Sequence, residues 1–141
     1  MSTNNIKDQL KRDESEKLFP YKDSVGKITI GVGHNLTDDG IPQTISDALL
    51  NYDLQKVYGH LSTVPWMVKL QSTDNIRWNV LVNMCFNMGF GGLMSFKTFL
   101  GLMEQGKWNE AATDGRSTVW YKQVGARAER LMKQLETGEW V

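Results

Sequence analysis

The amino-acid sequence predicts an α+β fold that is mostly helical, with a small N-terminal β-hairpin lobe and a larger C-terminal helical lobe. Residues 21–33 are rich in β-branched residues and glycine, which is typical of a short hairpin. From residue 44 onward, apolar residues recur at helical spacing. A cleft between two lobes is a common place for a ligand, and we expect the active site there.

The first predicted element is a short amphipathic helix over residues 3–18. Ile6 and Leu10 give it a thin apolar stripe, and Glu14 would lie in its last turn. Pro20 would end it, because proline lacks the N–H that helical bonding needs.

A hairpin over residues 21–33 follows. Asp23 begins the turn "DSVG", and Thr29 lies on the returning strand. Residues 35–42, "NLTDDGIP", have the composition of a loop.

Helices are predicted for the rest of the chain. Thr44 and Asp47 resemble a capping box before a helix over residues 45–61. Asp74 would cap the next helix, which is apolar almost all round and which the glycines of residues 89–92 would stop. Shorter helices are expected over residues 95–106, 107–114 and 124–138.

Together these elements fit a single domain over residues 1–141. We expect the β-containing lobe at about 13–43, a connecting helix at 44–62, and a helical lobe formed by 63–141 with the N-terminal helix. No internal repeat or low-complexity linker interrupts the chain.

Composition and charge exclude several classes of function. With 16 basic and 16 acidic residues the formal net charge is zero, so bulk charge draws the chain neither to nucleic acid nor to an anionic membrane. No apolar stretch approaches the roughly 20 residues of a membrane-spanning helix, and we see no export signal. Cys85, the single cysteine, lies in an apolar run and is expected to be a buried small hydrophobe.

Two carboxylates in different surroundings suit the hydrolysis of a glycosidic bond. One must protonate the leaving oxygen while the other handles water or the oxocarbenium-like centre. Glu14 at a helix end and Asp23 on a polar hairpin fit these roles. Taken alone, the pattern fits structural roles too: a solvated helix face for Glu14, a turn former for Asp23, and a strand residue for Thr29.

The spacing of these residues resembles a known signature. Residues 12–34 read "RDESEKLFPYKDSVGKITIGVGH", with Glu14, then Asp23, then Thr29 opening a Thr-Ile-Gly-x-Gly-His turn. This resembles the N-terminal signature of the phage-type lysozymes, glycoside hydrolase family 24, typified by the T-even phage enzyme. Four further segments resemble the family in order: "NMCFNMGFGGLMSF", "EQGKWNEAA", "WYKQVGARAER" and "TGEW".

The resemblance implies a lysozyme-like bilobed fold and an inverting N-acetylmuramidase. It would hydrolyse the β-1,4 bond between N-acetylmuramic acid and N-acetylglucosamine of peptidoglycan. Glu14 would be the general acid, while Asp23 and Thr29 would position and activate the attacking water. Arg127 matches the family arginine that faces the catalytic glutamate and would hold it. No metal or organic cofactor is implied.

The resemblance also suggests residues around the substrate. Gly33 would let the backbone approach a sugar, and Asn83, Phe86 and Asn87 would line the sugar cleft, although Phe86 equally suits the core. Asn87 stands where the type enzyme has an amide side chain that is one carbon longer. The region between residues 34 and 52 is shorter than in that enzyme. His34 would be structural, bonded to a carboxylate for which Asp53 is our candidate.

The expected setting follows the same resemblance. The partner would be the glycan strands of bacterial peptidoglycan, with no nucleic acid and no membrane insertion. We expect a monomer that waits in the host bacterial cytoplasm until a holin-type membrane pore releases it to the cell wall. The alternatives are a catalytically silent peptidoglycan- or protein-binding module, a lytic transglycosylase-like or chitin-directed enzyme, and a purely structural helical protein.

Overall fold

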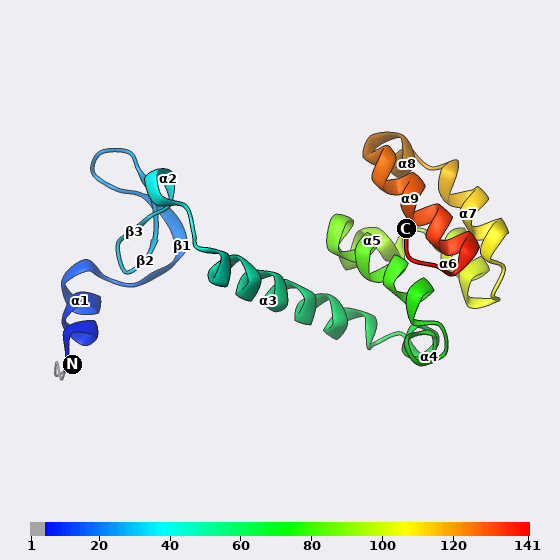
Figure 1. Cartoon of the computed structure of the whole chain (residues 1–141), viewed down its shortest axis with the longest axis horizontal. Coiled ribbons are helices and arrows are strands. Elements are labelled where there is room, and N and C mark those ends of the chain that lie inside the picture. The colour runs from blue at the N-terminus through cyan, green and yellow to red at the C-terminus, as the bar shows by residue number, and fades with distance from the viewer. Residues whose placement is uncertain (1–4) are drawn as a thin grey trace. The chain divides into compact units, whose positions relative to one another are not determined.

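The computed structural model describes residues 5–141, which divide into two compact units. Unit 1 reaches to Leu49 and unit 2 runs from Leu50 to Val141, so the boundary falls within helix α3 (Gln43–Leu61). All three described strands lie in unit 1, whereas the regular elements of unit 2 are all helices (Figure 1). The predicted mostly helical α+β fold is confirmed.

The predicted hairpin is the centre of unit 1. Its antiparallel sheet has the order β1 (Lys17–Lys22), β2 (Ile28–Gly31), β3 (His34–Asn35). Asp23 opens the β1–β2 turn: its N–H donates to the carbonyl of Lys27 over 2.9 Å, and Gly26 N–H donates back to its carbonyl over 3.1 Å. Thr29 lies on the central strand, paired with Tyr21 and Asn35.

The first helix is shorter than the sequence predicts. Helix α1 spans Ile6–Glu14, and Ser15 ends it with a φ of 67°, a conformation that cannot continue a right-handed helix. The prediction that Pro20 terminates the helix is wrong. Pro20 lies inside β1, an edge strand with an irregular register between Lys17 and Tyr21, where a missing N–H is tolerated. The start of the predicted helix at Thr3 lies outside the described residues.

Two local predictions between the sheet and α3 are also wrong. Within the expected loop over residues 35–42, a one-turn helix, α2 (Leu36–Asp39), forms because the Asn35 side chain accepts the N–H of Asp38. The predicted capping box is absent because α3 already begins at Gln43. The Gln43 amide instead donates to the Asp47 carboxylate over 2.8 Å.

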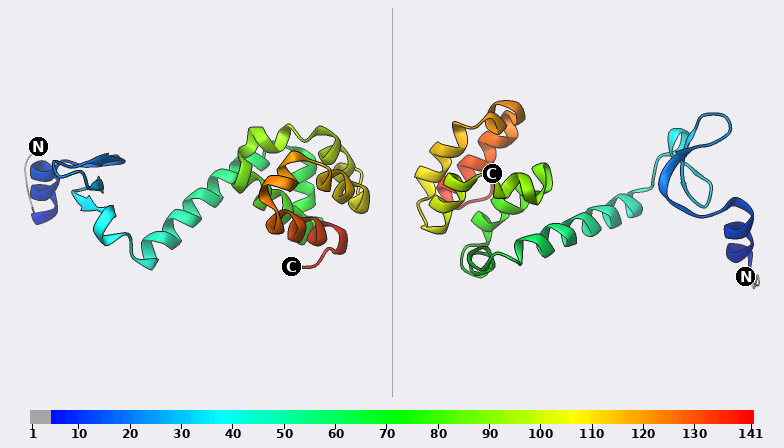
Figure 2. Two further views of the ribbon diagram at one scale, coloured as in Figure 1. Left: turned by 90° about the horizontal axis from the view of Figure 1, so that it is seen from above. Right: turned by 180° about the vertical axis from the view of Figure 1, so that it is seen from behind.

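Unit 2 is a bundle around α5 (Asn75–Met94), with its helices visible from two directions in Figure 2. Helix α5 packs against α4 (Pro65–Thr73) and α9 (Ala126–Thr137). The remaining helices are α6 (Lys97–Glu104), α7 (Trp108–Arg116) and α8 (Val119–Val124).

The predicted start of the central helix is confirmed, and its predicted end is only partly correct. Asp74 caps α5 by accepting the N–H of Arg77. Gly89, with φ 80° and ψ 163°, breaks the helical path, as expected for a residue that tolerates positive φ. The helix then resumes and reaches Met94.

The described hydrophobic core lies in unit 2. Val80, Leu81, Met84 and Phe99 are among its fully buried members, and Cys85 is buried as expected. Burial raises the pKa of the Cys85 thiol, because the charged thiolate loses hydration. Within residues 5–141, no helix combines the length and apolar character needed to cross a membrane.

An ion-pair network ties α7 to α9. Arg116 donates to Glu129 over 2.9 and 3.1 Å and to Glu136 over 2.6 and 3.1 Å, and the Tyr121 hydroxyl donates to Glu129 over 2.6 Å. The hydrogen bonds from Arg116 and then Tyr121 lower the pKa of Glu129 to about 2, and those from Arg116 lower the pKa of Glu136. Both carboxylates are therefore stabilised in their charged form.

This network predicts a specific acid sensitivity. A carboxylate with a lowered pKa stabilises the folded state above its unfolded pKa and loses that contribution as pH falls through the folded value. The melting temperature of the wild type should therefore exceed that of Arg116→Gln near neutral pH, and the difference should shrink from about pH 5 to about pH 2. Thermal unfolding of both proteins across this range is the measurement. A difference that does not change with pH would contradict the role of the network.

Candidate functional site

Glu14 is the last residue of α1 and is exposed. Its carboxylate lies against the turn between β2 and β3: a methyl group added at Gly33 would lie 3.2 Å from Glu14 Oε2. Gly33 also has a φ of 67°, which favours glycine. Within residues 5–141 the Glu14 carboxylate has no hydrogen bond or ion pair, so it is available to a ligand.

The side chains of Asp23 and Thr29 both bond to the backbone of one residue, Lys27. Asp23 Oδ1 accepts the N–H groups of Val25 and Lys27 over 3.0 and 2.8 Å, and the Thr29 hydroxyl donates to the Lys27 carbonyl over 3.1 Å. Thr29 is only 5% exposed, which restricts its side chain. Oδ2 of Asp23 makes no hydrogen bond within the described chain, and the lone pairs of the Thr29 hydroxyl can still accept one.

His34 has a structural contact within unit 1. Its Nε2 lies 2.5 Å from the carbonyl oxygen of Gly40 at the end of α2. Contacts beside it hold α2 to the hairpin: Ile28 N–H donates to the Thr37 hydroxyl over 2.8 Å, and Lys27 pairs with Asp38 over 3.0 Å. The proposed contact of His34 with Asp53 would join the two units and stays a prediction.

The other predicted groups belong to unit 2, where Arg127 is bound to Asn83. The Arg127 guanidinium donates to Asn83 Oδ1 over 3.0 and 2.7 Å, which fixes the amide and the cation together. Both side chains line a pocket of about 230 Å³ with Phe86, which is 43% exposed. Leu50, Leu54, Asn79, Val82, Gln134 and Trp140 complete its wall. The expected approach of Arg127 to Glu14 stays a prediction.

Asn87 does not line that pocket but is held in place by a partner that the sequence did not suggest. The indole N–H of Trp120, in α8, donates to Asn87 Oδ1 over 3.0 Å. Asn79, by contrast, could have been found, because it precedes Asn83 and Phe86 by four and seven residues on one helix face. The contacts of Asn83 with Arg127 and of Asn87 with Trp120 span 44 and 33 residues, so no local pattern marks them.

Among residues 5–141, no group of three or more His, Cys, Asp or Glu side chains is arranged to hold a metal ion. The available chemistry is that of a free carboxylate, a fixed carboxylate and a hydroxyl in unit 1, together with a pocket carrying amide, aromatic and guanidinium groups in unit 2.

Comparison with known proteins connects these features to one family. The model of the phage lysozyme family matches residues 11–137. Probable T4-type lysozyme 1 of Dictyostelium discoideum is 33% identical over 160 aligned positions, covering 94% of this chain and 94% of that protein. The endolysin of Salmonella phage P22 is 37% identical over 97 positions, 63% of each chain.

A third relative is a longer protein, which the match covers only in part. The pre-baseplate central spike protein Gp5 of Enterobacteria phage T4 is 30% identical over 161 positions, covering 93% of this chain and 27% of that protein. The match to the family model spans Glu14, Asp23 and Thr29 as well as Asn83 and Arg127. The chain therefore belongs to the phage lysozyme family.

Proposed function

We propose that this protein is a lysozyme of the N-acetylmuramidase type, which hydrolyses the β-1,4 bond between N-acetylmuramic acid and N-acetylglucosamine in peptidoglycan. The observation that carries the proposal is the contrast between two carboxylates in one family signature. Glu14 is unpaired beside Gly33, whereas Asp23 is fixed through Oδ1 and bonds, like Thr29, to the backbone of Lys27. Membership of the phage lysozyme family supports it.

In the proposed reaction, Glu14 gives its proton to the glycosidic oxygen as the bond from that oxygen to the anomeric carbon breaks. A water molecule forms the new bond to the anomeric carbon from the opposite face. Asp23 Oδ2 takes a proton from this water, and the Thr29 hydroxyl accepts a hydrogen bond that orients it. Because water attacks directly, the configuration at the anomeric carbon inverts.

The remaining groups would bind the glycan and support the catalytic residues. The pocket of Asn83, Phe86 and Arg127 would hold sugar units of the same strand, with amide and guanidinium donors for oxygens and the phenyl ring for an apolar sugar face. Gly33 would leave room for the glycan strand beside the Glu14 carboxylate. After proton transfer, Arg127 would stabilise the Glu14 carboxylate by its charge. Asn87 would add a polar group near the sugar, oriented by Trp120.

We also propose host cell lysis as the biological role, which the P22 relative named endolysin supports. The protein would act as a monomer. It would wait in the host bacterial cytoplasm and reach the cell wall through a holin-type membrane pore. His34 would keep the turn after β2 in place through its contact with the Gly40 carbonyl, with a bond to Asp53 as a further contact.

The product of the reaction tests the proposed chemistry. Purified Gram-negative peptidoglycan is incubated with the wild type, and the soluble fragments are identified by mass spectrometry before and after borohydride reduction. Reducing N-acetylmuramic acid ends are expected. Anhydro-muramic ends would replace the proposal with a lytic transglycosylase, and reducing N-acetylglucosamine ends would place the cleavage at the other bond. Binding of the wall without soluble fragments would indicate a silent binding module.

A further inference from the structure

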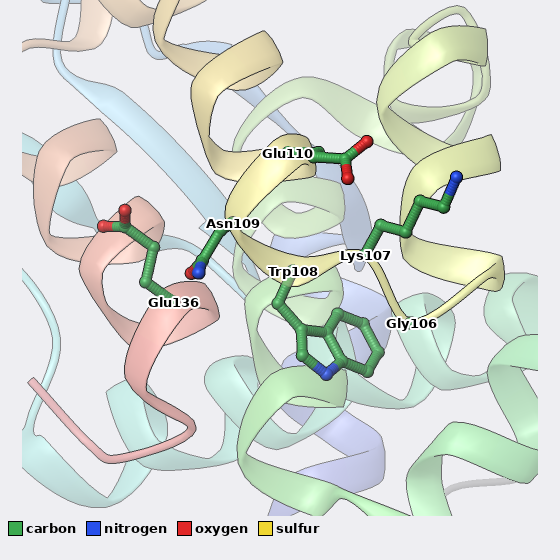
Figure 3. A pocket seen from close by; sticks show the side chains of 6 residues that line it. All are labelled: Gly106, Lys107, Trp108, Asn109, Glu110 and Glu136. Carbon is green, nitrogen blue, oxygen red and sulfur yellow. The ribbon is translucent and has the colours of Figure 1, made fainter.

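A second hollowed region of unit 2 lies around the start of α7. Two neighbouring pockets of about 300 and 280 Å³ share Gly106 and Trp108. The first is lined by the residues in Figure 3, namely Gly106, Lys107, Trp108, Asn109, Glu110 and Glu136. The second adds a further indole, Trp66, from α4. None of these residues lines the pocket of Asn83 and Arg127, so the two regions of unit 2 are separate.

The Trp108 indole is half-buried and held from one face. The Arg77 guanidinium lies 4.9 Å from the centre of its ring, a cation–π contact. Arg77 is itself fixed by hydrogen bonds to the carbonyls of Leu135 and Glu136 over 2.7 and 3.0 Å. A ring oriented in this way loses little freedom when a ligand stacks on it, which favours binding.

Several polar side chains around the indole have no hydrogen-bond or ion-pair partner among the described residues. Within the described chain, no hydrogen bond or ion pair engages the side chains of Lys107, Asn109 and Glu110 in the first pocket, or of Lys69, Glu104 and Gln105 in the second. Figure 3 shows the Lys107 and Glu110 side chains reaching to one side of the chain and the Trp108 indole to the other. These groups can donate and accept hydrogen bonds to a ligand that has both kinds of partner.

The charges of the region are balanced. Lys107 is offset by Glu110 and Lys69 by Glu104, while Glu136 is already paired with Arg116. Such a surface does not favour an anionic ligand such as nucleic acid. It favours an uncharged ligand with many hydroxyl or amide groups and an apolar face. A chain of N-acetylated hexoses has these properties, because one face of each pyranose ring presents C–H groups that stack on an indole.

We propose that the Trp108 region is a second glycan-binding site, which takes N-acetylated sugars of a peptidoglycan strand and keeps the enzyme on the wall between cleavage events. The proposal rests on the proposed function for the identity of the polymer. Trp108 and Trp66 provide stacking surfaces. Lys69 and Gln105, which line the same pocket as both indoles, and Asn109, which lines the first pocket with Trp108, bond the hydroxyl and acetamido groups. All the lining residues belong to unit 2.

Binding to whole sacculi tests the site without cleavage. In the Glu14→Gln background, Trp108→Leu should bind insoluble peptidoglycan about tenfold more weakly, which corresponds to about 1.4 kcal/mol. Trp108→Phe, the matched variant, keeps a ring and should recover most of the affinity. Thermal unfolding of both variants checks that they are folded. A folded Trp108→Leu variant with unchanged affinity would overturn the proposal, as would a Trp108→Phe variant as weak as Trp108→Leu.

A second measurement leaves the Trp108 region unaltered. The indole N–H signals of Glu14→Gln are followed by NMR during titration with the trisaccharide of N-acetylglucosamine. The signals of Trp108 and Trp66 should move, while that of buried Trp78 should stay. Unmoved Trp108 and Trp66 signals at millimolar trisaccharide would refute the site, even if other signals respond. The proposed function fails separately, if wild type releases no fragments from peptidoglycan.

Discussion

Lysis of permeabilised Gram-negative cells should fall at least about 100-fold when Glu14 is replaced by glutamine, because the amide cannot supply the proton that the leaving oxygen needs. The fold should be unaffected. Glu14 is exposed, ends its helix, and has no hydrogen bond or ion pair among the described residues. The loss of turbidity of a cell suspension measures lysis, and circular dichroism with thermal unfolding shows whether the variant is folded.

Glu16→Gln is the matched control. Glu16 is also an exposed glutamate, two residues further along, and it makes only an exposed ion pair with Lys11 at 3.8 Å. It should lyse cells at nearly the wild-type rate. Equal rates for wild type and folded Glu14→Gln would remove Glu14 from the mechanism. Equal losses in the two variants would mean that negative charge in this segment, rather than the acid at Glu14, supports activity.

The largest loss of stability is expected in the core of unit 2. Phe99→Ala should lower the free energy of unfolding by about 3–5 kcal/mol, because it removes buried apolar contacts and leaves a cavity. Phe99 is 0% exposed. Its ring lies 6.3 Å from that of Phe96 in an edge-to-face arrangement, and a methyl group at Gly115 would lie 3.3 Å from it. Urea unfolding followed by tryptophan fluorescence gives the value.

Phe19→Ala is the control for that loss. Phe19 is 82% exposed on β1, so its removal takes little apolar surface back into water and should change stability by less than about 0.5 kcal/mol. A small effect of Phe99→Ala would contradict the described core. A large effect of Phe19→Ala would show that Phe19 is buried in solution by a contact beyond those described.

Local chemistry explains which parts of the fold could be predicted from the sequence. The Asp74 cap and the Asp23 turn depend on neighbouring residues, and both were predicted correctly. The same holds for the buried Cys85, which lies in a long apolar run. At the candidate site, the signature pointed to Glu14, Asp23 and Thr29. The approach of Glu14 to Gly33, and the bonds of Asp23 and Thr29 to the Lys27 backbone, became visible only in the structure.

The features that could not be predicted depend on context. The end of α1 is set by Ser15, a residue that usually avoids positive φ, so nothing in its type predicts the break. Pro20 is tolerated because its strand lies at the edge of the sheet, a fact of topology. The bond of Arg127 to Asn83 and that of Trp120 to Asn87 connect separate helices.

The configuration of the first product shows whether Glu14 acts as the acid while Asp23 and Thr29 direct a water to the opposite face of the sugar. A soluble peptidoglycan fragment is cleaved in an NMR tube, and the new anomeric proton is recorded before mutarotation equilibrates it. We expect the α-anomer of N-acetylmuramic acid to appear first. The β-anomer appearing first would mean a retaining reaction and would contradict the assigned roles.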